Sequence, residues 1–363
     1  MKSMKKAFIL LLTGILVLSL VGCGNNASPS SSTGTSTSKA AESAQDANST
    51  SDEKIVITFA GTTAETHPLA LGAYAFKEYM EKNSDGRVEV NLHLNGQLGS
   101  GRELAEAVQA GTITLCDNSI SSYANFTDKY LGLSLPFMFT SNGILKKFLD
   151  SDVLEQLNQE VAGDTNIYAA AFCFNGTRSL SSSKSAVVSP ADLKNQKIRV
   201  MESPMYIKMF EAMGASPIPM AYSELYTGMQ QGTIDGQDNP PVTFYTNAFY
   251  EVQKYFTYLG HTRDISVCMS NQEWYLALPD DIREMFDAGM IVYRDTVNVG
   301  MDDMEGSALE DLKGVIDVTI LNDEQIAEFK ESCAPVYEWY EKEYTDSYLD
   351  AIRAEVDSIA ASI

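Results

Sequence analysis

The pattern of apolar and polar positions predicts alternating strands and helices at the start of the folded part of the chain. Residues 55–59 form a continuous apolar run typical of a buried strand, and 88–94 alternate apolar and polar residues with a period of two. Helical spacing covers 69–82 and 102–110, and 113–116 is a further apolar run. This order of strands and helices is typical of an open α/β lobe.

Apolar runs also predict strands over 166–174, 197–200 and 265–269. A longer pattern follows Pro279, where apolar residues recur every three or four positions to about residue 313. This predicts one amphipathic helix over 281–313, ending at Gly314.

About 33 helical residues span roughly 50 Å, which is longer than one small domain is wide. We therefore expect this helix to lie across two lobes. The alternative is a pair of helices broken near Gly289 or Gly300.

The first 22 residues are predicted to be a signal peptide. Lys2, Lys5 and Lys6 precede an apolar run over 7–20, which is shorter than the about 20 residues that a membrane-spanning helix needs. The run ends in Leu-Val-Gly-Cys, which resembles a bacterial lipobox, so Cys23 is the predicted lipidation site. The alternative is an ordinary signal peptide with an incidental cysteine.

Residues 23–53 are predicted to be a lipidated cysteine followed by a flexible tether. From 24 onward the segment is rich in Ser, Thr, Asn and Ala and has no aromatic residue. Such a composition has too little apolar surface to offset chain entropy. A single lipid would attach the protein to a membrane without a membrane span.

Charge and length narrow the choice of function and fold. The chain has 363 residues and a formal net charge of −23, which argues against nucleic acid as a partner. The hydrophobic content of 44% is ordinary for a packed protein, and a chain of this length usually forms two lobes.

Sequence motifs give no indication of an enzyme, a cofactor or a metal site. The chain has no Gly-Lys dipeptide and so no phosphate-binding Walker loop, and it has no Gly-x-Ser-x-Gly elbow. Its three histidines are far apart, and there is no Cys-x-x-Cys pair. Cys116, Cys173 and Cys268 lie in apolar runs, so buried free thiols are predicted there, while the pairing of the four later cysteines stays open.

Two arginines in apolar surroundings are candidates for binding an anion. Arg199 alternates with Ile198 and Val200 in a predicted strand, so it extends from one face while its neighbours reach the core on the other. Arg178 follows another apolar run. A guanidinium in such a place can bind a carboxylate through two parallel hydrogen bonds, and a surface salt bridge is the alternative. The segment 230–241 is dense in Gly, Asn, Asp and Gln and is predicted to be a binding-site loop.

Four segments together resemble a known family. They are Ser-Pro-Ala-Asp-Leu-Lys-Asn-Gln-Lys-Ile-Arg-Val (189–200), Met-Gly-Ala-Ser-Pro-Ile-Pro-Met (213–220), Gln-Gly-Thr-Ile-Asp-Gly-Gln-Asp-Asn-Pro (231–240) and Tyr-Glu-Val-Gln-Lys-Tyr (250–255). In this order and spacing they are similar to the solute-binding proteins of TRAP transporters, the DctP-type family. The resemblance covers about 55–345.

The resemblance implies a two-lobed α/β fold of the periplasmic-binding-protein type, with a ligand cleft between the lobes and a long helix that spans both. Lobe I is expected to comprise 54–175 plus 265–304, and lobe II 176–264 plus 305–363. The ligand-binding residues that it implies, with neighbours chosen from the sequence, are Arg199, Arg178, Asn239, Tyr222, Glu202, Asn175, Thr62, Thr63, His67, Asn118 and Ser119.

The resemblance also implies a function and partners. The protein would capture an organic acid by its carboxylate and deliver it to a small and a large integral membrane permease subunit, at the outer face of the cytoplasmic membrane. Glu202 is an acceptor suited to sugar hydroxyls, so a sugar acid such as a uronate or an aldonate is favoured. A C4-dicarboxylate or a keto acid is the alternative ligand, and a ligand-sensing lipoprotein without transport is the alternative role.

Overall fold

A computed structural model of the chain describes residues 54–345 and 348–363. The predicted signal peptide, Cys23 and the predicted tether lie outside these residues. Among the described residues, no helix combines the length and the apolar character needed to cross a membrane.

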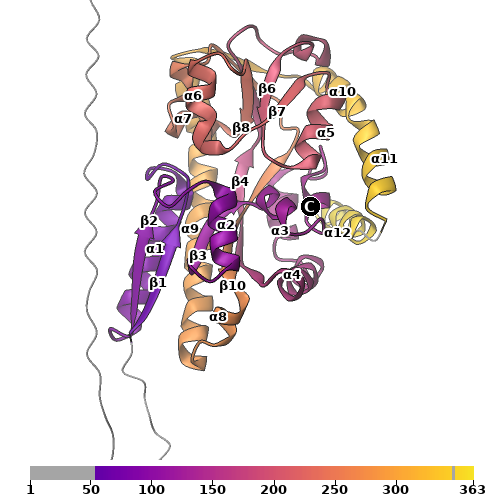
Figure 1. Cartoon of the computed structure of the whole chain (residues 1–363). Coiled ribbons are helices and arrows are strands. Elements are labelled where there is room, and N and C mark those ends of the chain that lie inside the picture. The colour runs from indigo at the N-terminus through magenta and orange to yellow at the C-terminus, as the bar shows by residue number, and fades with distance from the viewer. Residues whose placement is uncertain (1–53, 346–347) are drawn as a thin grey trace, which may run out of the picture. The chain divides into compact units, whose positions relative to one another are not determined.

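Two separate β-sheets form the framework of the described part (Figure 1). The first sheet has five strands in the spatial order β2 (Val88–His93), β1 (Ile55–Ala60), β3 (Leu115–Ser119), β10 (Arg263–Asn271) and β4 (Ile167–Thr177). Strand β1 runs parallel to β2 and β3, whereas β10 is antiparallel to β3 and β4.

The second sheet has six strands in the spatial order β11 (Asp317–Ile320), β9 (Tyr255–Tyr258), β5 (Ser179–Ser182), β8 (Gly236–Asn239), β6 (Lys197–Val200) and β7 (Ser216–Pro219). The strands predicted from apolar runs are confirmed as β1, β2, β3, β4, β6 and β10. The mixed α/β architecture predicted from the sequence is therefore present.

The chain passes between the sheets three times, through two adjacent extended segments and through the long helix described below. It leaves the first sheet at the end of β4 and enters the second with β5, and it returns between β9 and β10. The two extended segments are hydrogen-bonded to each other, because Arg178 N–H donates to the Thr262 carbonyl at 2.9 Å and Gly260 N–H donates to the Arg178 carbonyl at 3.1 Å. Arg178 is thus fixed at the junction of the two sheets.

Helices cover the sheets and connect their strands. Around the first sheet are α1 (Pro68–Asn83), α2 (Gly101–Gln109), α3 (Asn142–Phe148), α4 (Asp152–Thr165) and α8 (Gln272–Leu276). Near the second are α5 (Pro204–Ala212), α6 (Leu225–Gln230), α7 (Pro241–Thr246), α10 (Asp323–Ser332) and α11 (Ala334–Glu343). Short 3-10 helices are η1 (Ile120–Asn125), η2 (Leu131–Ser134), η3 (Pro190–Leu193), η4 (Tyr222–Glu224) and η5 (Phe249–Glu251).

Local sequence explains where helices begin. Helix α2 starts with a capping box, in which Ser100 and Glu103 satisfy each other's backbone N–H groups. Helix α1 has proline at its first turn, and the ring of His67 accepts a hydrogen bond from Leu69 N–H. This cap fixes the His67 ring at the start of α1.

One long helix, α9 (Asp280–Lys313, 34 residues), contacts both parts of the structure. It packs against α1 and β4 and, further along, against α7 and β11. The prediction of a single helix is confirmed. Gly289 does not break it; a Cβ atom there would lie 3.0 Å from side-chain atoms of Phe76 and Met80, so glycine allows α1 and α9 to approach closely.

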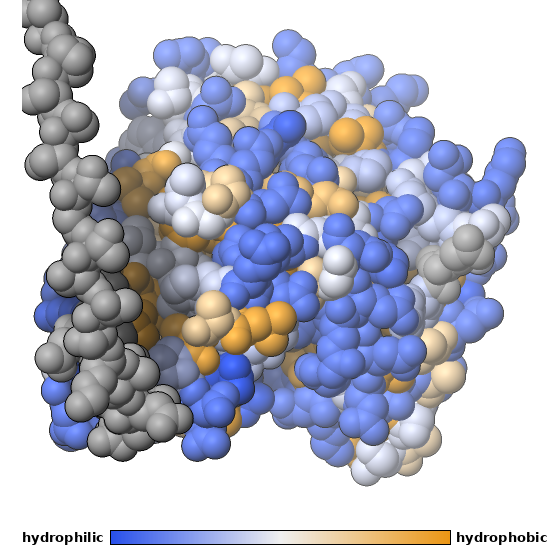
Figure 2. Space-filling model, turned by 60° about the horizontal axis from the view of Figure 1, so that its bottom comes forward, coloured by the Kyte–Doolittle hydropathy of each residue, from blue (hydrophilic) through white to orange (hydrophobic). Residues whose placement is uncertain are grey.

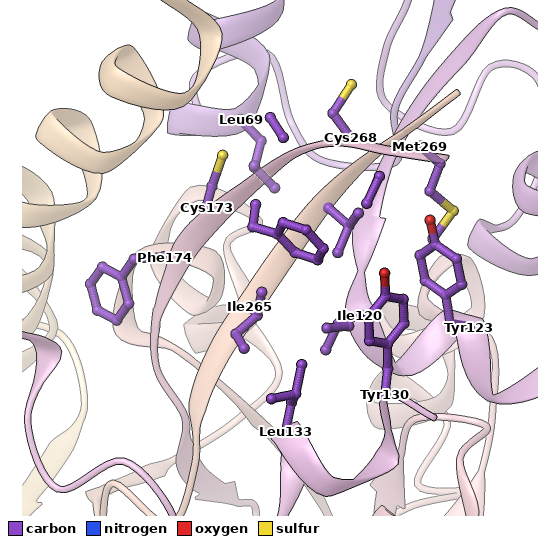
Figure 3. Close-up of a cluster of buried hydrophobic side chains, with 14 of the residues drawn as sticks. Leu69, Ile120, Tyr123, Tyr130, Leu133, Cys173, Phe174, Ile265, Cys268 and Met269 are labelled. Atoms are coloured by element: carbon purple, nitrogen blue, oxygen red, sulfur yellow. The ribbon is translucent and has the colours of Figure 1, made fainter. Parts of the chain in front are cut away.

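Large apolar side chains fill the core around the first sheet (Figure 3). Cys173 and Cys268 extend from the paired strands β4 and β10 into this core. With Cys116 and Cys333 they are buried and free, so the prediction of buried free thiols for the first three is confirmed. A smaller apolar cluster, which includes Leu225, Phe244 and Phe256, packs near the second sheet, while Leu180, Ile198 and Val200 of that sheet belong to the large core.

The last helix, α12 (Leu349–Ala361), packs against α3 and α4, whereas α11 packs against α5. The C-terminal segment therefore contacts elements near both sheets, and the assignment of 305–363 to one lobe stays a prediction. The face shown in Figure 2 is mainly hydrophilic with small apolar patches, as the acidic composition leads one to expect.

Candidate functional site

A pocket lies where residues within or just after strands of both sheets come together. Ten of the eleven predicted ligand-binding residues line it within the described part: Thr62, Thr63, Asn118, Ser119, Asn175, Arg178, Arg199, Glu202, Tyr222 and Asn239. Thr62 and Thr63 follow β1, and Arg199 lies within β6. Their role in ligand binding stays a prediction, but the fold brings them to one cavity.

Arg199 is a buried cation with free hydrogen-bond donors. Its side chain is only 3% exposed, and its Nε donates to the Met220 carbonyl at 2.9 Å. Its two terminal nitrogens make no hydrogen bond to any described residue. Burial lowers the pKa of Arg199 to about 10, which leaves it charged at neutral pH. A cation held in this way at a pocket wall has its two terminal nitrogens available for an anion.

Arg178 is bound by the protein itself. Its Nε donates to Asp238 Oδ2 at 2.6 Å and its Nη1 to Asp264 Oδ2 at 3.1 Å. Its Nη2 donates to the Asp238 carbonyl and to Asn239 Oδ1. Burial acts to lower the pKa of Arg178, but Asp238, Tyr206 and Asp264 together outweigh burial and raise it. Arg178 therefore has few donors left for a ligand.

Asn239 is oriented by this network. Its Oδ1 accepts from Arg178, and its Nδ2 donates to Gln237 Oε1 at 2.5 Å. Both Nδ2 hydrogens can donate, so one remains for the pocket. Asp238 pairs instead with Arg178 and with His261 Nε2, away from the pocket lining.

The prediction of a loop over 230–241 is wrong in its centre. Residues 236–239 form β8, a fully buried strand between β5 and β6. A Cβ on Gly236 would lie 2.0 Å from the Ser181 carbonyl oxygen, so only glycine fits here. Polar residues can form this central strand because Asp238 Oδ2 accepts from Arg178 and lies 3.2 Å from His261 Nε2, and Gln237 donates to Ser181.

His67, the eleventh predicted residue, lies behind the pocket. Its Nδ1 accepts from Leu69 N–H, and its Nε2 lies 3.1 Å from Thr243 Oγ1, which lines the pocket. Burial lowers the pKa of His67 to about 3, so the ring is neutral. Since Nδ1 accepts, Nε2 carries the proton and donates to Thr243.

Asp117 is the main pocket residue that sequence reasoning missed. It lies in the middle of β3, directly before Asn118, and is 1% exposed. Neither carboxylate oxygen has a hydrogen-bond partner among the described residues. Burial raises its pKa to about 7. Asp117 directly follows the predicted strand over 113–116, and this position was the signal that could have identified it as a pocket residue. Asp264 and Thr243 also line the pocket, but the sequence around them gave no such signal.

The raised pKa of Asp117 predicts a pH-dependent stability. Its folded-state pKa lies above the unfolded value near 3.9, so it contributes stability at low pH that is lost as pH rises through about 7. Asp117→Asn removes this ionisable group. In the absence of ligand, the unfolding free energy of Asp117→Asn minus that of the wild type should therefore increase by about 2–3 kcal/mol between pH 5 and pH 8. Urea unfolding of both proteins at the two pH values measures this. An equal pH response would contradict it.

Comparison with known proteins identifies the family. The family model described as DctP, bacterial extracellular solute-binding protein, family 7, matches residues 59–343. The chain belongs to the DctP family. A solute-binding protein from Verminephrobacter eiseniae is 33% identical over 295 residues, covering 81% of this chain and 87% of that protein.

Two further matches agree with this family. The C4-dicarboxylate-binding periplasmic protein DctP from Vibrio cholerae is 27% identical, covering 83% of this chain and 91% of that protein. A TRAP periplasmic solute-binding protein from Bordetella bronchiseptica, with density assigned to pantoate, has a TM-score of 0.78 and 29% identity, covering 83% of this chain and 99% of that one.

These findings confirm the DctP family and its two-lobed α/β fold. Members of the family are extracytoplasmic binding proteins that serve transport and are not enzymes. The ligand class and the lipid anchor of this DctP-family chain stay predictions.

Proposed function

We propose that this protein captures an organic acid by pairing the ligand carboxylate with Arg199 and delivers it to a TRAP permease. The observation that carries the proposal is the state of Arg199, a buried cation whose two terminal nitrogens make no hydrogen bond to the described protein. Removing charge from water is costly unless it is paired, so an anionic ligand gains affinity by pairing with it. Asn239 would supply a further donor.

The proposed ligand is a hydroxylated monocarboxylate, such as a uronate or an aldonate. A dicarboxylate needs a second free cation, but Arg178 is already paired with Asp238 and Asp264. Asp117 and Glu202 also line the pocket, and a second carboxylate would lie unfavourably near them. Pantoate, the acid assigned in the Bordetella relative, is a hydroxy monocarboxylate.

C4-dicarboxylate binding is the second candidate. It is favoured by the relative from Vibrio cholerae, whose name states this ligand. In that case Arg178 would have to release part of its present network, or another donor such as Arg102 at the pocket wall would take part.

We further propose that Cys23 carries a lipid, that residues 24–53 tether the binding domain at the outer face of the cytoplasmic membrane, and that the two lobes close over the ligand. Two integral membrane permease subunits would be the partners. Release of the protein from membranes by a Cys23→Ser substitution would support the anchor, and unchanged membrane association would exclude it. A permease gene pair beside this gene would favour transport over a sensing role.

A thermal-shift screen tests the ligand class. The purified full-length protein is heated with D-glucuronate, D-galacturonate, D-gluconate, D-galactonate, succinate, L-malate, pyruvate, sialic acid or amino acids. A ligand at 100 times its Kd adds about 2.7 kcal/mol of stability, a shift of several degrees. We expect the largest shifts with sugar acids. Shifts with dicarboxylates alone would make the second candidate correct.

A further inference from the structure

The carboxyl group of Asp117 has an unusual position for an ionisable group. It lines the same pocket as Arg199 but comes from the first sheet, whereas Arg199 comes from the second. Both of its oxygens are buried, and neither has a hydrogen-bond partner in the described part of the chain. Its neighbours are engaged, since Asn118 donates to the Gly101 carbonyl and Ser119 donates to Asp264. A buried carboxylate without a partner is costly, so a protein gains by supplying one.

Within residues 54–345 and 348–363, no cation compensates the Asp117 carboxylate. The titratable groups that interact with it are Cys116 on its own strand, Cys173 on β4, Cys268 on β10 and Tyr293 on α9. Cys268 lies directly opposite Asp117 in the strand register and belongs to the apolar cluster of Figure 3. Burial raises the pKa of all four groups, so they are neutral near pH 7.

The other elements near Asp117 also supply no cation that pairs with its carboxylate. After β1, the backbone of Gly61 lies so close that a Cβ there would be 2.8 Å from Asp117 Oδ2. At the start of α1, His67 is neutral because it is buried. From the second sheet, neither Arg199 nor Arg178 contributes to the pKa shift of Asp117, whose cause is burial. Asp117 and Arg199 therefore line the same pocket without pairing with each other.

We propose that Asp117 couples ligand capture to the release of a proton and selects acids that carry a hydrogen-bond donor away from their carboxylate. This rests on the proposed function, in which Arg199 binds the ligand carboxylate. The opposite end of the ligand then reaches Asp117, and a hydroxyl or ammonium group there donates to a carboxylate oxygen. A charge-assisted hydrogen bond of this kind is about twice as strong as a neutral one, so it favours the ionised form.

The proton balance follows directly. In the free protein a substantial part of the molecules carries a protonated Asp117 near pH 7, because burial raises its pKa to about 7. On binding, the O–H bond of the carboxyl group breaks and the proton passes to the buffer. The ligand hydroxyl keeps its own proton and donates it as a hydrogen bond to the new carboxylate.

The test measures affinity and proton exchange together. Titration calorimetry of the full-length protein is performed with D-glucuronate, D-gluconate and succinate at pH 5.5, 7 and 8, in two buffers that differ in ionisation enthalpy. Binding of the sugar acids should tighten by up to about 30-fold from pH 5.5 to pH 8 and release about half a proton at pH 7. Succinate has no such donor and should release none if it binds.

Two variants isolate the role of Asp117. Asp117→Asn should bind the sugar acids with an affinity that changes less than threefold over this pH range. Because the Asp117 carboxyl group has no hydrogen-bond partner among the described residues, this change breaks no side-chain hydrogen bond there, and folding should be preserved. Asp235→Asn is the matched control: Asp235 is a buried carboxylate outside the pocket, bound to Lys197 N–H, and should keep the wild-type pH profile.

Each other outcome counts against the proposal. Affinity that is independent of pH, proton uptake, the same pH profile in Asp117→Asn, or binding of succinate alone would overturn the role of Asp117 and leave organic-acid capture intact. If none of the three probes and none of the screened acids binds the wild type at any pH, the proposed function fails, and this inference fails with it.

Discussion

Replacement of Arg199 by alanine is expected to weaken ligand binding by roughly 30-fold to several thousand-fold. The reason is that the ligand carboxylate would be buried without its cation, which costs about 2–5 kcal/mol. Titration calorimetry with the acid that gives the largest thermal shift measures the change. Arg199→Lys should recover part of the loss, because it restores the charge but not the planar pair of donors.

Arg263→Ala is a suitable control for this prediction. Arg263 is a half-buried arginine outside the pocket, and it donates to the Phe139 carbonyl and to Asn142 Oδ1. Its removal should lower stability without changing affinity. If Arg199→Ala changes the affinity by less than threefold, Arg199 does not bind the ligand, and the proposed mode of capture is wrong.

Replacement of Arg178 by alanine is expected to destabilise the fold by about 3–5 kcal/mol before any ligand is added. This substitution leaves Asp238 and Asp264 buried without their cation, at the junction where the chain passes between the sheets. Urea unfolding of the ligand-free protein measures the loss. The corresponding Arg199→Ala variant should lose little stability, since Arg199 has no counter-ion in the described protein.

A second substitution tests the cause of this loss. In Arg178→Ala, the further change Asp238→Asn removes one of the two stranded charges and should restore part of the stability. It should restore none if the loss comes only from the missing packing of Arg178 against the Tyr206 ring, 5.3 Å away. A stable Arg178→Ala protein that has lost only affinity would instead make Arg178 a ligand-binding residue.

Periodicity in the sequence was sufficient to predict several elements of this protein. The long helix α9 was predicted because its buried residues recur at a spacing that only a helix places on one face. Strands β1 and β2 were predicted because burial of a strand leaves a continuous or alternating apolar pattern. The order of the motifs around Arg199 and Asn239 identified the family and most of the residues that line the pocket.

Tertiary structure alone decided which polar residues have partners. The sequence predicted a loop at residues 236–239, but these residues form the buried strand β8. Its polar side chains can be buried because they contact Arg178, Ser181 and His261 from other parts of the chain. Arg178 and Arg199 had similar sequence surroundings, but two carboxylates pair with Arg178, and no carboxylate of the described residues pairs with Arg199. Asp117 was not predicted as a pocket residue, because the sequence does not show whether a carboxylate has a partner in the folded protein. Burial of one face of a helix or strand requires apolar residues at regular intervals, and these intervals are visible in the sequence. Pairing of buried charges depends on residues that are distant in the sequence and that only folding brings together.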